Sequence, residues 1–339
     1  MTDARTAPAA HRGAASRMRR ASTAVALAAS ALLVTSCAAP DEPAAAAFDL
    51  RVGALTTQNV LTLCQASGGL DAPLAAAGGT ASASEPFALF APAAEALAAD
   101  RIDVSSSGAT GVLTALEGNS DLVIFAVERG ANDTQGIVAG ADTGIRDVSD
   151  LAGRTVAINQ GGTGEYLLRR ALEGEGLALE DVEPVYLAPA DAAAAFGAGH
   201  VDAWATWDQY LVGSQLDLGA QLVATAADID AHNPSVHVVS RAFLEAHPEA
   251  VRAAYDALAD CAENMADDPG IVADAYRDAG ASDAVAEAIA SGTQPEIVPA
   301  DEAFAAEFAD LADFYAAQGM SEPLIDTSPA TVDATTLGD

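Results

Sequence analysis

Two short segments of small and hydroxyl-bearing residues each stand between a predicted strand and a predicted helix. Residues 105–110 read Ser-Ser-Ser-Gly-Ala-Thr, and residues 159–164 read Asn-Gln-Gly-Gly-Thr-Gly. The first backbone N–H groups of a helix lack partners within the helix and attract anions. Glycine lets a ligand approach the backbone closely, while Ser107, Thr110 and Thr163 can donate hydroxyl hydrogens. Each segment alone is more often a plain connection, but two that face each other across a cleft would form an oxyanion site.

Both tryptophans of the chain lie in residues 202–210, which read Asp-Ala-Trp-Ala-Thr-Trp-Asp-Gln-Tyr. The segment ends a predicted strand, and open α/β sheets bind ligands beyond the carboxyl ends of their strands. Strand alternation puts Trp204 and Thr206 on one face and leaves Trp207 at the exit. We therefore predict that Trp204 belongs to the core and that Trp207 and Asp208 border a cleft. The alternative is that both indoles serve only in packing.

The residues give other chemistries little support. All 15 basic residues are arginines, and the lack of lysine excludes a Walker-type phosphate loop and a Schiff-base mechanism. Residues 159–164 lack the G-x-G-x-x-G spacing of a dinucleotide site. The five histidines are scattered, and His232 and His237 have no nearby cysteine or cluster of acids that would complete a metal site. We expect no metal, no cofactor and no catalysis; an enzyme would need a positioned nucleophile and base.

Composition places the protein among acidic globular chains. Its 339 residues include 49 Asp and Glu against 15 basic residues, for a net charge of −34, and 51% of the residues are hydrophobic. That hydrophobic share is enough for a sizeable core, and the length suggests two domains or one divided domain. A nucleic-acid partner is not expected, because binding a polyphosphate requires a basic surface.

The first 36 residues are typical of an export signal. An uncharged apolar stretch, residues 21–34, follows Arg12, Arg17, Arg19 and Arg20 and runs into Val-Thr-Ser-Cys. This tetrapeptide resembles a bacterial lipobox, which implies that Cys37 becomes a lipidated N-terminus outside the cytoplasm. An ordinary cleaved signal with an incidental cysteine is the alternative, and an arginine pair leaves general or twin-arginine export open. Removing residues 1–36 takes away five arginines and one aspartate, so the net charge changes from −34 to −38.

The exported chain would begin with a spacer and contain two further cysteines. Residues 37–48 are rich in alanine and proline and predict a flexible tether. Cys64 and Cys261 are candidates for a disulfide, because the compartment outside the cytoplasm permits one. The alternative is two unpaired buried thiols, since spacing along the chain does not fix the distance between them.

Strand-like and helical segments alternate through much of the chain, which predicts an α/β fold with helices on the faces of a parallel sheet. The predicted strands are residues 50–54, 87–90, 102–104, 121–127, 155–158, 182–187, 201–206 and 237–240. The predicted helices are residues 60–70, 92–99, 111–116, 166–173, 190–198, 241–246, 248–265, 269–278, 283–291 and 301–318.

Three segments carry a resemblance to a known family. They are D-L-A-G-R-T-V-A-I-N-Q-G at residues 150–161, Y-L-L-R-R-A-L at residues 166–172, and the run from V-Y-L-A-P at residue 185 to W-D-Q-Y at residue 210. In order and spacing they resemble the solute-binding proteins of ABC transporters of the nitrate, sulfonate and taurine group, above all the aliphatic sulfonate-binding proteins. The resemblance is weaker before residue 105 and after residue 250.

This resemblance implies a type II periplasmic-binding-protein fold, in which two α/β lobes are joined by two hinge crossings and enclose a ligand cleft. Residues 49–135 would form the first part of lobe one, 136–236 lobe two, 237–322 the return to lobe one with the C-terminal helices, and 323–339 a tail. The resemblance also implies a binding protein that delivers a small ligand to an ABC permease and is attached to the cell membrane through Cys37. We expect it to be a monomer.

The resemblance further assigns candidate ligand contacts, for a small organosulfonate or a related oxyanion. Arg129 is the basic residue that we place at the cleft. Because the net charge is strongly negative, a thiamine precursor, a zwitterion or a neutral heterocycle is the alternative ligand. An enzyme on this fold is a weaker alternative, since the cysteine-rich motif of the related thiamine-precursor synthases is absent. An adhesive lipoprotein is also weaker, because the paired loops argue for ligand binding. The candidate contacts are Thr56, Thr57, Ser107, Gly108, Ala109, Thr110, Gly162, Thr163, Gly164, Trp207, Asp208 and Asn233.

Overall fold

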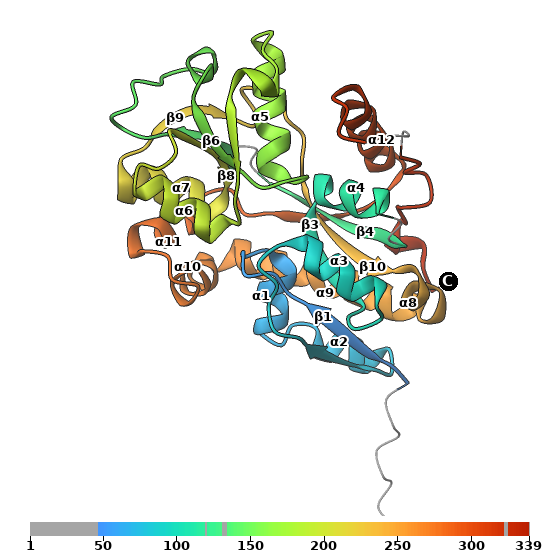
Figure 1. The fold of residues 1–339 in the computed structure, drawn as a ribbon. Coiled ribbons are helices and arrows are strands. Elements are labelled where there is room, and N and C mark those ends of the chain that lie inside the picture. Colours follow the sequence, from blue (N-terminus) through green and yellow to red (C-terminus); the bar gives the residue numbers. More distant parts are fainter. Residues whose placement is uncertain (1–46, 119–120, 131–133, 322–324, 339) are drawn as a thin grey trace, which may run out of the picture. The chain divides into compact units, whose positions relative to one another are not determined.

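Two β-sheets with helices packed on them organise the chain from residue 47 onward (Figure 1). The computed structural model describes residues 47–118, 121–130, 134–321 and 325–338. The first sheet has the order β11-β4-β10-β3-β1-β2 and the second the order β7-β6-β8-β5-β9. We call the first sheet with its helices lobe one, and the segment from β5 to β9 lobe two. The strands are β1 (Asp49–Gly53), β2 (Thr80–Ala83), β3 (Val104–Gly108), β4 (Leu122–Arg129), β5 (Gln135–Ala139), β6 (Thr155–Ile158), β7 (Glu183–Tyr186), β8 (Ala203–Trp207), β9 (Gln221–Thr225), β10 (Ser235–Ser240) and β11 (Glu296–Pro299).

The α-helices follow the strands in alternation through both lobes and dominate after β10. In chain order they are α1 (Val60–Ala66), α2 (Asp71–Ala76), α3 (Phe90–Ala98), α4 (Ala109–Glu117), α5 (Thr163–Gly174), α6 (Pro189–Gly197), α7 (Asp208–Leu218), α8 (Arg241–Ala246), α9 (Pro248–Asp267), α10 (Pro269–Asp278), α11 (Asp283–Ala290) and α12 (Glu302–Ala317). Short 3₁₀ turns lie at Val148–Leu151, Leu179–Asp181 and Ala334–Thr336.

The chain crosses between the lobes twice, from β4 to β5 and from β9 to β10, and these crossings explain why the sheets are mixed rather than parallel. Strands β1, β2 and β3 are parallel, as are β6, β7 and β8. Strand β10 runs antiparallel to β3 and β4, and β5 runs antiparallel to β8 and β9. A parallel neighbour needs a crossover connection within one sheet. Because β5 and β10 enter from the other lobe, they are free of that requirement, and the expectation of parallel sheets was wrong for them.

Several predicted elements differ from those observed. Residues 105–108, expected in a loop, form most of β3, because the ladders to β1 and β10 outweigh the low strand propensity of serine and glycine. Residues 87–90 form one bridge, Leu55 with Phe87, instead of a strand. Residues 60–70 divide into α1 and a turn, and β2, β9, β11 and α7 were not predicted.

Helices on the two faces of the lobe-one sheet build two apolar clusters. On one face, α1, α2 and α9 pack together with Leu61, Leu74 and Leu258 in the core. On the other face, a cluster runs from α4 through α12 to α5 of lobe two, with Leu113 and Leu167 fully buried. The second cluster therefore joins the lobes by apolar packing.

The start of the folded region corrects one end of the predicted tether. Phe48 is buried, and its ring lies 6.0 Å from that of Phe243 and 5.2 Å from that of His247. Residue 48 therefore belongs to the core of lobe one. The predicted export signal, the lipidation site Cys37 and the rest of the tether up to residue 46 lie outside the described residues.

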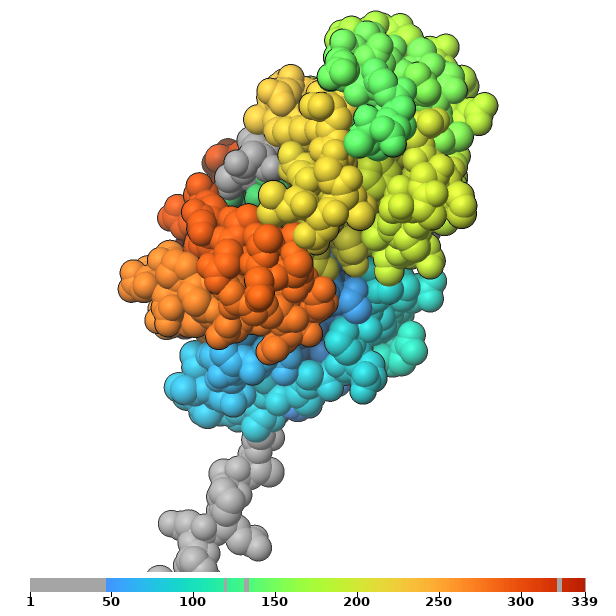
Figure 2. Space-filling model, turned by 90° about the vertical axis from the view of Figure 1, so that its left-hand side faces the viewer, coloured from blue at the N-terminus to red at the C-terminus, as the bar shows by residue number. Residues whose placement is uncertain are grey.

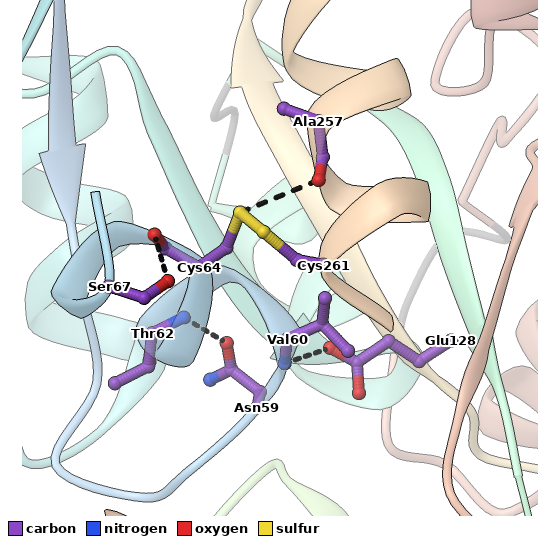
Figure 3. The surroundings of a disulfide bond; sticks show 8 residues. All are labelled: Asn59, Val60, Thr62, Cys64, Ser67, Glu128, Ala257 and Cys261. Atoms are coloured by element: carbon purple, nitrogen blue, oxygen red, sulfur yellow. Dashed lines mark hydrogen bonds between the residues drawn. A yellow bond between two sulfur atoms is a disulfide. The ribbon is translucent and has the colours of Figure 1, made fainter. Parts of the chain in front are cut away.

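A disulfide joins Cys64 of α1 to Cys261 of α9, with the Cα atoms 5.6 Å apart (Figure 3). Gly69 packs directly on it, because a Cβ atom there would lie 2.4 Å from the Cys261 sulfur. The disulfide fixes the first helix of lobe one to the long helix that follows β10.

Residues near the C-terminus return to lobe one. Thr331 forms a bridge with Ile124 of β4, and Ala334 is fully buried. Among the described residues, no helix is both long and apolar enough to span a bilayer.

Candidate ligand-binding site

A cavity of about 760 Å³ lies between the lobes, and we call it the central cavity. The N-terminal ends of α1, α4 and α5 and the β8–α7 junction border it, so it is placed where strands end and helices begin. The side chains of its wall are a mixture of apolar and polar groups. The polar lining residues include Thr57, Asn59, Ser106, Ser107, Thr110, Thr114, Glu128, Arg129, Gln135, Asn159, Thr163, Trp207, Asp208, His232, Asn233 and Tyr276.

Most of the candidates from the sequence lie around this cavity. Three do not line it: Thr56 is exposed, and Ala109 and Gly164 are buried behind the wall. The prediction that Trp204 belongs to the core is confirmed, since it is 3% exposed and packs on Phe196 and Tyr210. The lining candidates are Thr57, Ser107, Gly108, Thr110, Gly162, Thr163, Trp207, Asp208 and Asn233.

The backbone amides expected to meet an anion are partly occupied by the protein itself. The Ala109 amide donates to the Pro234 carbonyl at 3.0 Å. The Thr110 amide donates to Asn233 Oδ1 at 3.0 Å, and the Gly164 amide donates to Asn159 Oδ1 at 2.7 Å. These three amides are therefore unavailable to a ligand in this conformation. The expected donors that remain at the cavity include the side chains of Ser107 and Thr163 and the backbone at Gly162.

Asn233 links the two predicted loops, which the sequence could not show. Its Oδ1 accepts from Thr110 at the start of α4, and its Nδ2 donates to Thr163 Oγ1 at the start of α5, at 2.9 Å. Gly108 is needed beside this bridge, because a Cβ atom there would lie 2.9 Å from Asn233 Nδ2. The side chain is 4% exposed. Asn233 thus holds the N-termini of two helices from different lobes against each other.

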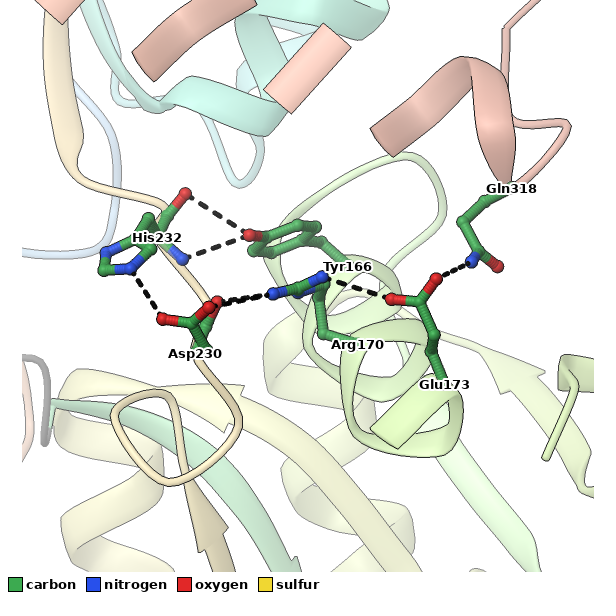
Figure 4. A network of polar contacts seen from close by, with 6 residues as sticks. All are labelled: Tyr166, Arg170, Glu173, Asp230, His232 and Gln318. Carbon is green, nitrogen blue, oxygen red and sulfur yellow. Dashed lines mark hydrogen bonds and ion pairs between the residues drawn. The ribbon is translucent and has the colours of Figure 1, made fainter. Parts of the chain in front are cut away.

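A polar network holds the crossing segment that carries Asn233 (Figure 4). The amide of His232 donates to the hydroxyl of Tyr166 at 3.0 Å. Arg170 donates to the Asp230 carbonyl at 2.9 Å and forms an ion pair with Glu173 at 3.1 Å. Because Tyr166, Arg170 and Glu173 all come from α5, lobe two fixes the segment on one side.

Buried polar groups tie α1 to the lobe-one sheet beside the cavity. His237 is fully buried; its Nδ1 lies 2.8 Å from Ser106 Oγ and its Nε2 lies 3.0 Å from Glu128 Oε1. The Val60 amide donates to the same Glu128 oxygen at 2.8 Å (Figure 3), and Ser106 Oγ donates to Asn59 Oδ1 at 3.2 Å. Sequence reasoning missed Asn59, Ser106 and Glu128. The sequence did contain one signal: Glu128 is an acidic residue near the end of β4, which is otherwise largely apolar.

Asp208 is a carboxylate at the cavity whose pKa is shifted far from its ordinary value. Tyr276 of α10 donates to its Oδ1 at 2.6 Å, while its Oδ2 is buried and no described side chain donates to it. Burial raises the pKa of Asp208 to about 6, and the hydrogen bonds from Tyr276 and from the Gln209 amide offset only part of this rise. Burial and the nearby Asp208 charge together raise the pKa of Tyr276 well above its ordinary value. The negative charge of Glu128 acts in the same direction on both groups.

Arg129, the predicted basic residue of the cleft, lines the cavity but is already paired. Its two terminal nitrogens lie 2.9 and 3.0 Å from the carboxylate oxygens of Glu307, and its guanidinium lies 5.7 Å from the ring centre of Phe304. The described part of the cavity wall therefore carries three carboxylates, Glu95, Glu128 and Asp208, and an arginine that is paired with Glu307. None of the described residues forms a group of three or more His, Cys, Asp or Glu that could hold a metal.

Further contacts cross between the lobes at the rim. Thr114 of α4 donates to the Gly161 carbonyl at 2.6 Å. Helix α11 follows β10 in the chain but lies against α7 of lobe two, where Ser282, the residue before α11, donates to Asp217 at 3.0 Å. In Figure 2 the orange surface belongs to the segment after β10, and it lies against the yellow part of lobe two. The cavity is therefore bordered by both lobes, which contact each other at its rim.

Curated relatives match part of this chain. An Escherichia coli (strain K12) protein named as an aliphatic sulfonates-binding protein is 36% identical over 151 residues, which are 44% of this chain and 47% of that protein. A Bacillus subtilis (strain 168) protein of the same name is 29% identical over 160 residues, 47% of this chain and 48% of that protein. The chain thus spans about half the length of the curated relatives that it matches.

Solved structures extend the similarity to most of the described residues. The alkanesulfonate-binding protein SsuA from Xanthomonas axonopodis pv. citri, bound to MOPS, superposes with a TM-score of 0.77 at 25% identity and covers 84% of this chain and 98% of that one. The periplasmic aliphatic sulphonate binding protein SsuA from Escherichia coli gives 0.73 at 26% identity, with 83% and 91% covered. The two-lobed periplasmic-binding-protein fold predicted from the sequence is confirmed. A model of the family described as NMT1/THI5 like matches residues 90–271, more than half of the chain. The chain belongs to the NMT1/THI5-like family.

Proposed function

We propose that this protein is the substrate-binding component of an ABC importer. It captures a small organosulfonate or a related oxyanion in the central cavity, closes on it, and presents it to a membrane permease. A lipid on Cys37 holds the protein at the outer face of the cell membrane. The observation that carries the proposal is the cavity of about 760 Å³ bordered by both lobes, in a family whose named relatives include sulfonate-binding proteins.

A cavity that lies between two lobes is what ligand-driven closure requires. A ligand that touches both walls has more contacts in the closed arrangement than in an open one, and that difference shifts the equilibrium toward closure. Ser107 of lobe one and Thr163 of lobe two both line the cavity, as does Asn233 of the second crossing. The hydroxyl groups of Ser107 and Thr163 can therefore donate to sulfonate oxygens from both lobes.

Binding accounts for the buried polar groups better than catalysis does. Ser106, His237 and Glu128 lie in a row that resembles a nucleophile, a base and an acid. However, Ser106 is 2% exposed within β3, and its hydroxyl is engaged by Asn59. The Glu128 oxygen also accepts the first amide of α1. We therefore assign the row to positioning α1 at the cavity.

Calorimetry on the chain from residue 38, which includes every described helix and strand, tests the proposal. The panel contains C2 to C6 alkanesulfonates, nitrate, thiamine precursors and a neutral heterocycle. We expect saturable binding of a sulfonate and a raised melting temperature, since a ligand at about 100 times its Kd stabilises the native state by about 2.7 kcal/mol. Binding confined to cations or neutral compounds would contradict the ligand class.

Trp207→Ala tests whether the cavity is the site. Trp207 lines the cavity, whereas Tyr186 is a 46% exposed aromatic residue on β7 that does not line it. We expect Trp207→Ala to weaken sulfonate binding at least tenfold, while Tyr186→Ala, the matched control, binds as the unchanged protein does. Equal affinity of the two variants would place the ligand elsewhere.

A further inference from the structure

The disulfide lies beside the wall of the central cavity. On α1, Val60 and Leu63 line the cavity, and Leu63 is the residue next to Cys64. On α9, Met265 lines the cavity and follows Cys261 by four residues, so the two lie on the same face of the helix. Each cysteine is therefore within about one helical turn of a residue that can contact a ligand.

We propose that the bond between Cys64 and Cys261 is a positioning element for ligand binding: it holds the α1 and α9 parts of the cavity wall in the arrangement that binds the ligand. Breaking the bond then weakens ligand binding beyond any general loss of stability. This inference rests on the proposed function and adds to it a residue pair that acts on the ligand through other residues.

The first support is that α1 is too short to hold its own position. It has 7 residues, and an isolated helix of that length is marginal in water. Two polar links to the lobe-one sheet are at its start, where Glu128 accepts the Val60 amide at 2.8 Å and Ser106 donates to Asn59 at 3.2 Å. The disulfide lies toward the other end of the helix and joins it covalently to α9. Without the bond, the end of α1 that carries Leu63 is held by apolar packing.

The second support is the burial of the bond. Cys64 is fully buried, and Cys261 is 7% exposed. Gly69 packs against both sulfurs, because a Cβ atom there would lie 2.4 Å from one and 2.8 Å from the other. The bond belongs to the same apolar cluster as the lining residues Leu63 and Met265. A movement of either helix at the bond therefore reaches the cavity wall, since a densely packed core transmits strain.

The third support is that other wall residues depend on the same two helices. Asn59 lines the cavity and caps α1, since its side chain accepts from the Thr62 amide at 3.0 Å. Beyond Met265, α9 leads directly into α10, which adds Val272 to the same wall. A wall whose parts are already in place loses less conformational freedom when a ligand binds. Fixing α1 to α9 therefore favours binding by preorganisation.

Ligand affinity and hydrogen exchange together test the inference on the chain from residue 38, which lacks Cys37. We expect Cys64→Ala with Cys261→Ala to bind 1-butanesulfonate about tenfold more weakly than the oxidised protein in calorimetry, at a temperature where both are folded. The amides of α1 should exchange faster in this variant and slow again when the ligand is saturating.

Reduction of the unchanged protein gives a second form without the bond. Dithiothreitol gives the bond two electrons and two protons and becomes a cyclic disulfide, and intact mass after alkylation confirms the reduction. The reduced protein keeps every side chain, so this measurement does not depend on whether the variant folds. We expect the same loss of affinity and the same faster exchange of α1.

Leu151→Ala is the matched control. Leu151 is fully buried in lobe two and does not line the cavity, and its truncation lowers stability on the scale of a lost disulfide. We expect this variant to melt at a lower temperature but to keep both the affinity for 1-butanesulfonate and the slow exchange of α1.

The outcomes separate this inference from the proposed function. Equal affinity of the oxidised protein, the reduced protein and the double variant overturns the inference and leaves sulfonate binding intact. An equal loss in Leu151→Ala would reflect stability alone and also overturns it, as does a loss in the double variant that the reduced protein does not share. If the oxidised protein binds no sulfonate, the proposed function fails. The exchange of α1 then decides the positioning role: faster exchange without the bond supports it, and unchanged exchange overturns it.

Discussion

Asp208 combines an unusual backbone conformation with a buried charge. Its φ of 52° lies in the left-handed region, where aspartate and asparagine are among the few residues with side chains that are tolerated. Its carboxylate is held by Tyr276, and burial raises its pKa to about 6. An asparagine would keep the backbone conformation and the side-chain shape but remove the charge. Asp208→Asn therefore isolates the electrostatic contribution.

We expect Asp208→Asn to gain stability relative to the unchanged protein as the pH rises from about 4 to about 7. The folded-state pKa of about 6 exceeds the ordinary value of 3.8. The aspartate therefore favours folding most at low pH, and this contribution is lost as the pH rises through the folded-state pKa. The difference in pKa corresponds to about 3 kcal/mol. Denaturant unfolding of both proteins across this range measures it, and a stability difference independent of pH would contradict the prediction.

Asn233 joins the start of α4 in lobe one to the start of α5 in lobe two. Replacing it by alanine leaves the Thr110 amide and the Thr163 hydroxyl without their partner, at a cost of about 1–3 kcal/mol for each buried group left unsatisfied. We expect Asn233→Ala to lower the free energy of unfolding by an amount in this range and to weaken ligand binding. Asn264→Ala, an exposed position on α9, is the control. Equal stability of the two variants in urea unfolding would show that the bridge does not form in solution.

For single residues, the sequence predicted the positions that depend on the local pattern and missed those that depend on tertiary contacts. Strand alternation separated Trp204 in the core from Trp207 and Asp208 at the cavity. It could not show that Tyr276, 68 positions further on, holds Asp208, or that Asn233 would occupy the start of α4. Those partners depend on how distant segments pack, which no local spacing records.

Among the elements, capped helices were predicted best. Helices α8 and α10 match their predicted bounds, because Ser240 and Asp268 cap them and prolines begin α9 and α10. Strand β3 was read as a loop because its three serines and glycine have low strand propensity. Its neighbours β1 and β10 supply the hydrogen bonds that make it a strand, and neither pairing is visible in the sequence.

The disulfide covalently fixes α1 to α9, although its two cysteines lie 197 residues apart in the sequence. Closing so long a loop restricts the unfolded chain, and a native disulfide typically contributes about 2–5 kcal/mol. We expect Cys64→Ala with Cys261→Ala to lower the melting temperature of the chain. Reduction of the unchanged protein should lower it similarly. A scanning calorimetry trace of the double variant that matches the oxidised protein would show that α1 is held by packing and by Glu128 alone.

For the whole molecule, the two-lobed arrangement was predicted from the segments within residues 150–210, which carry the resemblance to the solute-binding proteins. Lobe one was harder to predict, because three of its strands, β4, β10 and β11, come from separate parts of the chain. The same arrangement gathers the cavity wall from both lobes and both crossings. A site of this kind exists only once the chain has folded, which is why its lining residues were predicted only in part.

The charge of the whole molecule bears on how it stays at a membrane. Without residues 1–36 the chain has a net charge of −38, and anionic lipid surfaces repel a strongly acidic protein. Attachment through surface electrostatics is thus disfavoured, and the proposed lipid on Cys37 must supply the affinity, at about 0.8 kcal/mol for each buried CH₂ group. We expect Cys37→Ser to move the protein from the membrane fraction to the soluble fraction without changing its ligand affinity. If acyl chains rather than ion pairs hold the protein, raising the salt concentration should not release the unchanged protein. Fractionation followed by intact-mass measurement tests both points, and a membrane-bound Cys37→Ser protein would contradict the anchor.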